Sequence, residues 1–319
     1  MSEQDSIHAF SFQDFPVRGK LVHLNASWQA VLERKDYPAH LRPLLGQALA
    51  SAVLLASTLK FDGRLTMQLQ SEGALKLLLS QCSSENHVRG LAHWSEEGAG
   101  HDGIQADQPV GPAGDERGNQ QGTELVRLSR LVGGRLAITI EPQREGRRYQ
   151  GIVPLEADTL APCVEAYFAS SEQLPTRLWL ASDSSKVVGM LLQQMPVDGG
   201  HHSAGHDPDA WPRVQMLADT ITDAELLQLS DHQILRRLFH QENVRLFESA
   251  PVSFKCSCSL QRIHSMLRGL GKEEIDSIIA EQGRVKIDCE FCGKTWRLDP
   301  VDAAALFAGA APGSGGMTH

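Results

Sequence analysis

The order of apolar and polar residues predicts a mixture of strands and helices in the first 196 residues. The stretch 38–59, rich in leucine and alanine, predicts a long helix that is buried on most sides. Arg64–Gln70 alternates polar and apolar residues, which is typical of a half-buried strand. Similar patterns predict a helix over 156–173 and strands at 75–81, 87–94, 135–141, 149–153, 177–181 and 187–193. Strands and helices do not alternate regularly, so we expect an α+β domain over residues 1–196.

Residues 197–250 have a different pattern, in which a glycine- and histidine-rich loop precedes short amphipathic helices. Thr222 with Glu225, and Ser230 with Gln233, have the spacing of capping boxes, which begin helices. The apolar faces of these helices consist of Met216, Leu217, Ile221, Leu226, Leu227, Leu229, Ile234, Leu235, Leu238 and Phe239. Helices this short are not stable alone in water. We therefore expect a metastable helical linker that stays folded only while it has a packing partner.

The remaining residues, 251–319, are expected to form a small C-terminal module. Two helical stretches, at 259–269 and 272–282, are followed by a predicted hairpin of 285–288 with 294–298. A module of this kind is too small to bury a sufficient apolar core without help. Bound metal would then supply much of its folding free energy, on the order of 10 kcal/mol in small zinc modules.

Four cysteines in this module have the spacing of a metal site. Cys256 and Cys258 are separated by one residue, Cys289 and Cys292 by two, and 30 residues lie between the pairs. Tetrahedral zinc prefers soft thiolate ligands, and two close pairs can surround the ion. The alternatives are that these cysteines are small buried hydrophobic residues, or that His264 replaces one ligand. The spacing favours one zinc ion held by Cys256, Cys258, Cys289 and Cys292.

Composition limits the partners of the protein. The chain has 319 residues, of which 41% are hydrophobic and 22% charged, and its net charge is −9. This negative charge argues against nonspecific nucleic-acid binding, and no apolar stretch is long enough to predict a membrane span. The acidic start lacks the apolar core of a signal peptide, and thiols in a reducing compartment serve metals or redox chemistry. We therefore expect a cytoplasmic protein that binds neither nucleic acid nor membrane.

Other candidate residues carry weaker signals. His201, His202 and His206 resemble a metal-binding tract, but the glycine-rich loop around them gives no fixed geometry. Cys82 and Cys163 lie in apolar segments and are interpreted as packed thiols. Residues 95–122 are predicted to be a mobile surface insertion, and residues 309–319 a disordered tail. Because no catalytic constellation is recognisable, we do not expect an enzyme.

The sequence resembles the thirty-three-kilodalton heat-shock protein family, which consists of bacterial cytosolic holdase chaperones. The strongest matches are FKCSC at 254–258 and CEFCGKTW at 289–296. The remaining matches are VRGKLV (17–22), KDYP (35–38), LKFDGRLTMQLQSEG (59–73), RYQGIVPLEADTLAPCVEAYFASSEQLPTRL (148–178), GMLLQQMP (189–196), ELLQL (225–229) and ILRRLFHQENV (234–244). The resemblance thus covers nearly the whole chain.

This resemblance implies an ATP-independent chaperone that is inactive while reduced and loaded with zinc. Oxidation would form the disulfides Cys256–Cys258 and Cys289–Cys292, release the zinc ion and unfold the linker. The activated form would dimerise and bind unfolding client proteins. The chain departs from the family pattern in the insertion near 95–122, the start of the linker and the tail.

Two other functions remain open on the residues themselves. One is a thiol–disulfide oxidoreductase that uses Cys289 and Cys292, although the C-x-x-C pair lacks the βαβ setting of such enzymes. The other is a constitutive zinc-stabilised adaptor, for which the acidic chain and the nearly neutral module offer no basic surface.

Overall fold

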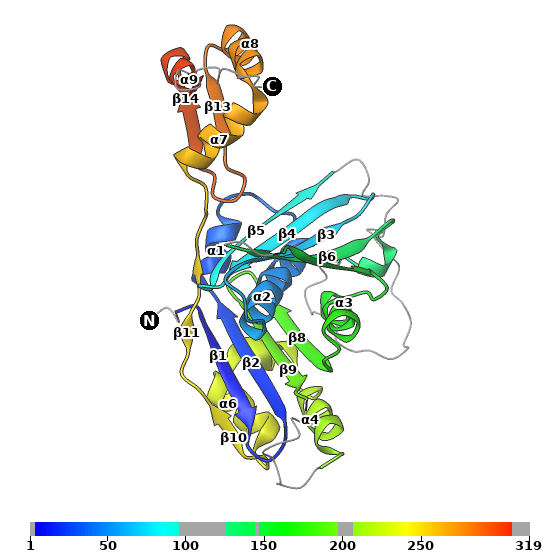
Figure 1. The fold of residues 1–319 in the computed structure, drawn as a ribbon. Helices are drawn as coiled ribbons and strands as arrows, with labels where there is room; N and C mark the ends of the chain where they lie inside the picture. Colours follow the sequence, from blue (N-terminus) through cyan, green and yellow to red (C-terminus); the bar gives the residue numbers. More distant parts are fainter. Residues whose placement is uncertain (1–3, 96–125, 144–146, 197–206, 308–319) are drawn as a thin grey trace, which may run out of the picture. The chain divides into compact units, whose positions relative to one another are not determined.

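The computed structural model of the protein describes residues 4–95, 126–143, 147–196 and 207–307 (Figure 1). The chain divides after Lys255 into two compact units, 1–255 and 256–319. The predicted insertion, the histidine tract at 201–206 and the predicted disordered tail lie outside the described residues, apart from residue 95. No helix in the described part of the chain has both the length and the apolar character that a membrane span requires.

The first unit contains two β-sheets. Sheet A has the order β10-β1-β2-β9-β8, and β11 also pairs with β1. Its neighbouring strands run antiparallel. The strands are β1 (Ser6–Phe12), β2 (Val17–Leu24), β8 (Thr176–Ser182), β9 (Val187–Gln194), β10 (Val244–Leu246) and β11 (Ala250–Pro251).

Sheet B has the order β12-β5-β4-β3-β6-β7. Its strands pair antiparallel except for β12, which runs parallel to β5. The strands are β3 (Gly63–Gln70), β4 (Leu75–Ser83), β5 (His87–Trp94), β6 (Arg135–Pro142), β7 (Tyr149–Pro154) and β12 (Ser253–Phe254). Helix α3 (Leu160–Tyr167) and the π-helical turn Phe168–Glu172 connect β7 to β8.

Helix α2 (Arg42–Thr58) contacts strands of both sheets and forms the centre of the core. Two glycines allow this close approach. A Cβ atom at Gly90 of β5 would lie 2.9 Å from Leu49 Cδ2, and one at Gly189 of β9 would lie 2.9 Å from Leu54 Cδ1. A side chain at either position would force these leucines to shift, so glycine lets α2 pack closely against both sheets.

Strand β9 is buried on both faces, since a hydrophobic cluster lies on each side of sheet A. Val187 and Leu191 face the core around α2. Val188, Met190 and Leu192 face the opposite side, which is covered by linker helices. These helices are α4 (Ala210–Ala218), α5 (Asp223–Gln228) and α6 (Asp231–Phe239). The two faces follow from the two-residue period of a strand.

Both predicted capping boxes are found at the starts of linker helices. The Thr222 N–H donates to Glu225 Oε2 at 3.0 Å, and the Glu225 N–H donates to Thr222 Oγ1 at 3.2 Å. The Ser230 N–H donates to Gln233 Oε1 at 2.9 Å. These bonds fix where α5 and α6 begin, and they confirm the predicted helix starts.

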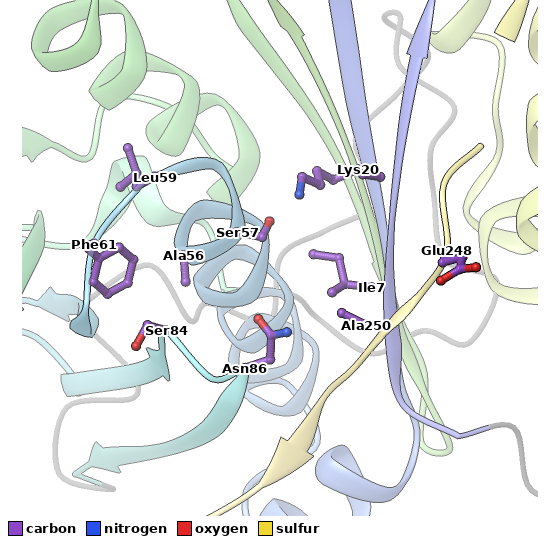
Figure 2. A pocket seen from close by; sticks show the side chains of 11 residues that line it. Ile7, Lys20, Ala56, Ser57, Leu59, Phe61, Ser84, Asn86, Glu248 and Ala250 are labelled. Carbon is purple, nitrogen blue, oxygen red and sulfur yellow. The ribbon is translucent and has the colours of Figure 1, made fainter. Parts of the chain in front are cut away.

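After α6 the chain is extended and passes along the edges of both sheets. A cavity of about 300 Å³ lies in this region, between the extended segment, β1, β2 and the end of α2 (Figure 2). Ile7, Lys20, Ala56, Glu248 and Ala250 are among the residues that line it. The cavity belongs entirely to the first unit.

The second unit is a small module with its own modest core. It contains α7 (Leu260–Leu270), α8 (Lys272–Gln282), the hairpin of β13 (Val285–Asp288) and β14 (Thr295–Leu298), and α9 (Pro300–Phe307). Its buried apolar residues are Ile263, Leu267, Ile275, Val285, Leu298, Ala303 and Leu306. Burial of so few side chains gives limited hydrophobic stabilisation, so a metal would contribute substantially to its stability.

The predicted α+β fold is confirmed, with some elements missing from the prediction. The helix predicted over 38–59 is α2, and the predicted strands of residues 64–193 are present. The helix predicted over 156–173 is shorter, because its last part forms the π-helical turn. Some elements were not predicted, namely β1, β2, β10, β11, β12, α1 (Ala26–Leu32) and α9.

Candidate metal centre

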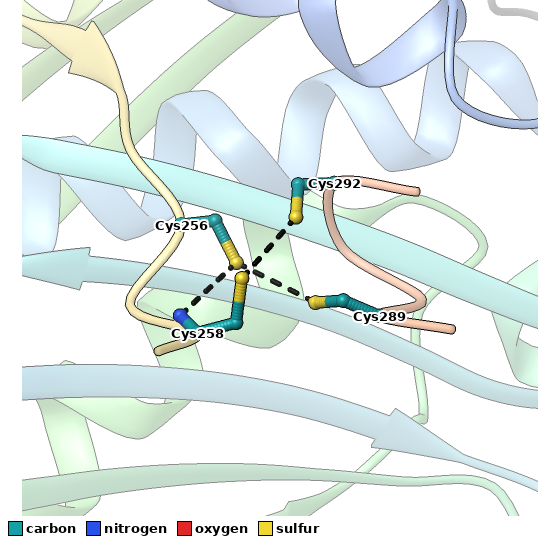
Figure 3. A group of neighbouring side chains, drawn as sticks. All are labelled: Cys256, Cys258, Cys289 and Cys292. Atoms are coloured by element: carbon teal, nitrogen blue, oxygen red, sulfur yellow. Dashed lines mark hydrogen bonds between the residues drawn. The ribbon is translucent and has the colours of Figure 1, made fainter. Parts of the chain in front are cut away.

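Two short segments of the second unit bring the four cysteines together (Figure 3). Cys256 and Cys258 lie in the extended chain before α7, whose N-cap residue Ser259 accepts the Arg262 N–H at 3.3 Å. Cys289 and Cys292 lie in the turn of the β13–β14 hairpin. The order of elements therefore places one pair opposite the other.

The hairpin turn is held by its own backbone. The Gly293 N–H donates to the Cys289 carbonyl at 2.7 Å, and the Cys289 N–H donates to the Lys294 carbonyl at 2.9 Å. Gly293 has φ +68°, in the left-handed region that favours glycine. The sequence CEFCG thus forms a turn in which both thiols project to the same side, as Figure 3 shows.

The sulfur geometry fits a tetrahedral metal ion. All four Sγ atoms lie within 4.8 Å of one another. The Cys256–Cys289 and Cys258–Cys292 sulfur distances are 3.6 and 3.4 Å. Zinc–sulfur bonds of about 2.3 Å in a tetrahedron would place neighbouring sulfurs about 3.8 Å apart. These separations are too long for disulfides, and all four residues are free cysteines.

The surroundings of the four cysteines favour ionisation of one thiol but oppose ionisation of several thiols at the same time. Burial opposes ionisation of Cys256, but the Cys258 N–H at 3.5 Å and hydrogen bonds from neighbouring thiols lower the pKa of Cys256 to about 7. Burial raises the pKa of Cys258, and so do its hydrogen bonds to Cys292 and Cys256 and the negative charges of Cys256 and Cys289. Burial also raises the pKa of Cys289. Four thiolates at this spacing therefore require a cation to balance their charge.

His264, Cys82 and Cys163 do not join this cluster. Among the described residues, these four cysteines alone form a group of potential ligands with metal-binding spacing, and His264 is a partly exposed residue of α7. Cys82 and Cys163 are 0% and 2% exposed, and burial raises the pKa of Cys82 to about 12. Both are packed thiols, as predicted.

A second arrangement connects the linker to sheet A and was not predicted. Asp231, the first residue of α6, is a buried carboxylate. Its Oδ1 lies 2.5 Å from His23 Nε2 of β2 and forms a hydrogen bond with it. Its Oδ2 lies 2.5 Å from His8 Nδ1 of β1, where the two atoms form an ion pair whose angles do not fit a hydrogen bond. Burial opposes the charge, but the His23 hydrogen bond and the charges of both histidines lower the pKa of Asp231. We call these three residues the Asp231 cluster.

No local sequence pattern reveals the Asp231 cluster. His23 and Asp231 are 208 positions apart in the chain, and neither residue belongs to a motif. From the sequence, Asp231 is recognisable only as an acidic residue in the first turn of a helix. A solvent-exposed carboxylate at that position interacts favourably with the helix dipole. The sheet pairing of β1 with β2 brings the two histidines together.

Comparison with known proteins gives the family. A family model described as Hsp33 protein matches residues 5–299. The chain belongs to the Hsp33 family. Similar proteins include the 33 kDa chaperonin of Nitrosococcus oceani, 44% identical over 308 residues with 96% of each chain covered. That of Azotobacter vinelandii is 42% identical over 320 residues with 100% of each chain covered. The resemblance seen in the sequence is thereby confirmed.

A solved structure supports the fold of this Hsp33-family chain. The crystal structure of the 33 kDa chaperonin from Thermotoga maritima has a TM-score of 0.73 to the present structure. It is 19% identical in sequence, and the match covers 94% of this chain and 97% of that chain. At this level of identity the similarity concerns the fold alone.

Proposed function

We propose that the protein is a redox-regulated, ATP-independent holdase chaperone. In the reduced state, Cys256, Cys258, Cys289 and Cys292 would hold one zinc ion, and the protein would be inactive. Oxidation would release the zinc ion, unfold the module and the linker, and allow binding of unfolding proteins. The single observation that supports this most strongly is the four-sulfur cluster at tetrahedral spacing in a module with a small core.

The proposed switch is a pair of two-electron oxidations. Each pair of thiolates gives up two electrons to an oxidant such as hypochlorite, which is reduced to chloride and hydroxide, and one sulfur–sulfur bond forms per pair. We propose the pairs Cys256–Cys258 and Cys289–Cys292. The one- and two-residue separations keep these partners together when the module unfolds. A disulfide sulfur is a poor zinc ligand, so the ion leaves after oxidation.

The proposed client surface is the face of sheet A beneath the linker. Its side chains form a large apolar cluster with the linker helices, and they include Phe10, Phe12, Leu21, Trp179, Met190 and Leu192. Two aromatic contacts connect α6 to this face, since the Phe239 ring centre lies 6.3 Å from that of Phe10 and 5.0 Å from that of Phe12. Unfolding of the linker would expose an apolar patch that can bind apolar client segments without ATP.

We further propose that the protein is cytoplasmic and that its active form is a homodimer, in agreement with the family resemblance. Its clients are unfolding or oxidatively damaged proteins. The linker is a suitable conditional element, because its three helices are each shorter than ten residues and depend on the sheet for stability.

Aggregation of thermally unfolding citrate synthase tests the proposal. The reduced, zinc-loaded protein should not suppress aggregation, whereas the protein treated with hypochlorite should suppress it near stoichiometric amounts. Insulin reduction is the control for a thiol–disulfide oxidoreductase, and we expect no activity because the C-x-x-C pair lies in a β-hairpin turn rather than in a βαβ unit. Equal suppression by both forms, or rapid insulin reduction, would contradict the proposal.

A further inference from the structure

The segment after α6 covers one edge of each sheet in the first unit. We call residues 243–255 the edge strap. Along sheet A, the Gln13 N–H donates to the Asn243 carbonyl at 2.9 Å, and the Phe247 N–H donates to the Ala9 carbonyl at 2.9 Å. Without the strap, β1 would be an edge strand with a row of unpaired backbone groups.

The strap then crosses to sheet B and pairs with β5. The Ser253 N–H donates to the Asn86 carbonyl, and the Lys255 N–H donates to the Val88 carbonyl, both at 3.2 Å. Strand β12 of the strap is the outermost strand of sheet B, next to β5. One continuous segment therefore forms backbone hydrogen bonds with the edge strands of two different sheets.

Side chains of the strap alternate between buried and exposed positions, as in a β-strand bound to a protein surface. The even-numbered apolar residues are wholly or partly buried, namely Val244, Leu246, Ala250, Val252 and Phe254. The odd-numbered residues between them are exposed, namely Arg245, Phe247, Ser249, Pro251, Ser253 and Lys255. Such a pattern combines main-chain hydrogen bonds with pockets for every second side chain, as in recognition of peptides by strand addition.

The central residues of the strap lie next to the cavity described above. Glu248 and Ala250 line it from the strap, whereas Ile7 and Ala9 line it from β1 and Lys20 from β2 (Figure 2). Burial, with a smaller contribution from the charge of Arg18, lowers the pKa of Lys20. The cavity leaves space behind the strap for a side chain larger than alanine or for an acidic one.

The chain continues from the strap directly to the metal centre. Lys255, whose N–H makes the last hydrogen bond to β5, precedes Cys256. No flexible spacer separates the strap from the first metal ligand. Unfolding of the module would free the anchored end of the strap, and the entropy of the released chain would oppose its re-docking.

We propose that activation displaces the edge strap, and that the freed edges of β1 and β5 bind extended client segments by β-strand addition. The occupant is a segment of an unfolding protein with apolar residues at alternate positions, as in the strap itself. This inference rests on the proposed function and adds a backbone-directed site to the apolar face under the linker. An unfolded chain offers the free N–H and C=O groups that such pairing needs.

A synthetic peptide with the sequence of residues 243–255, NVRLFESAPVSFK, tests the proposal. Added to the full-length protein after hypochlorite treatment, it should compete with citrate synthase and reduce aggregation suppression in a dose-dependent way. It should bind the reduced protein at least about tenfold more weakly, because the intact strap occupies the edges.

Backbone methylation provides matched controls. N-methylation at Phe247 or Lys255 removes an N–H that bonds to β1 or β5, and it should weaken competition about tenfold or more. N-methylation at Leu246 should have little effect, because the Phe10–Leu246 pair alternates with hydrogen-bonded pairs and its N–H points away from β1. Equal potency of all three peptides, or no competition by the parent peptide, would overturn the proposal.

Hydrogen exchange at β1 separates the possible occupants. The Gln13 amide should be protected in the reduced protein, exposed after oxidation and protected again when the peptide or a client is added. Protection that returns with protein concentration alone would assign the edge to a second copy of the chain and overturn the client proposal. Failure of the proposed function would differ from both results, because the oxidised protein would then not suppress aggregation at all.

Discussion

Leu238 gives the sharpest test of the link between linker packing and activity. This residue of α6 is 2% exposed and belongs to the apolar cluster between the linker helices and sheet A. Substitution of a buried leucine by alanine costs about 2–5 kcal/mol. Because each 1.4 kcal/mol changes an equilibrium about tenfold, Leu238→Ala should raise the population with an open linker at least about 25-fold.

The assay compares variants in the reduced, zinc-loaded state. Leu238→Ala should increase the rate of proteolysis within residues 207–250 and give aggregation suppression without an oxidant. The zinc content should stay at one ion per chain, because the substitution lies outside the module. Leu226→Ala and Leu235→Ala should act in the same direction, since both side chains are also buried in the cluster.

Met216→Ala is the matched control within the same linker. Met216 lies on α4 but is 69% exposed, so its truncation should change neither proteolysis nor activity. The reasoning would be refuted if Leu238→Ala were cleaved at the wild-type rate. It would also be refuted if the linker opened about 25-fold more often while the protein stayed inactive.

Three further perturbations follow from particular contacts. The pKa of Asp231 is lowered in the folded protein, so the ionised carboxylate stabilises the fold above the ordinary carboxyl pKa of about 3.9, and this stabilisation is lost as the pH falls through the lowered pKa. Hydrogen exchange of α6 should therefore rise below about pH 4. Asp231→Asn should remove this pH dependence. Asp5→Ala should lower the free energy of unfolding by at least about 2 kcal/mol in thermal denaturation, since the buried carboxylate accepts three N–H groups at the start of α1, at 2.6, 2.9 and 2.6 Å. Cys258→Ser should abolish stoichiometric zinc binding and give a module that is unfolded by circular dichroism; a folded, zinc-loaded variant would contradict the assignment of this ligand.

The four-cysteine cluster could be predicted from local sequence because its residues lie in two short motifs. The spacing of Cys256 with Cys258 and of Cys289 with Cys292 was sufficient to group them. The same holds for the capping boxes at Thr222 and Ser230, whose partners are three residues away. The two members of each cysteine pair and of each capping box are therefore close together in the sequence.

The edge strap and the Asp231 cluster could not be predicted in this way. Both depend on pairing between segments more than 160 residues apart, which only the assembled sheets bring together. Strand β1 was overlooked although Ile7, Phe10 and Phe12 are buried, because its apolar positions do not alternate regularly. The division into residues 1–196, 197–250 and 251–319 stays a prediction.

A titration with hypochlorite tests most directly whether the metal centre controls activity. At each oxidant dose, the zinc released per chain and the suppression of citrate synthase aggregation are measured on the same sample. We expect the reduced protein to contain one zinc ion and to be inactive, and activity to rise in proportion to zinc release. A reduced protein without zinc, or with iron in its place, would contradict this mechanism, and so would activity that is independent of zinc release.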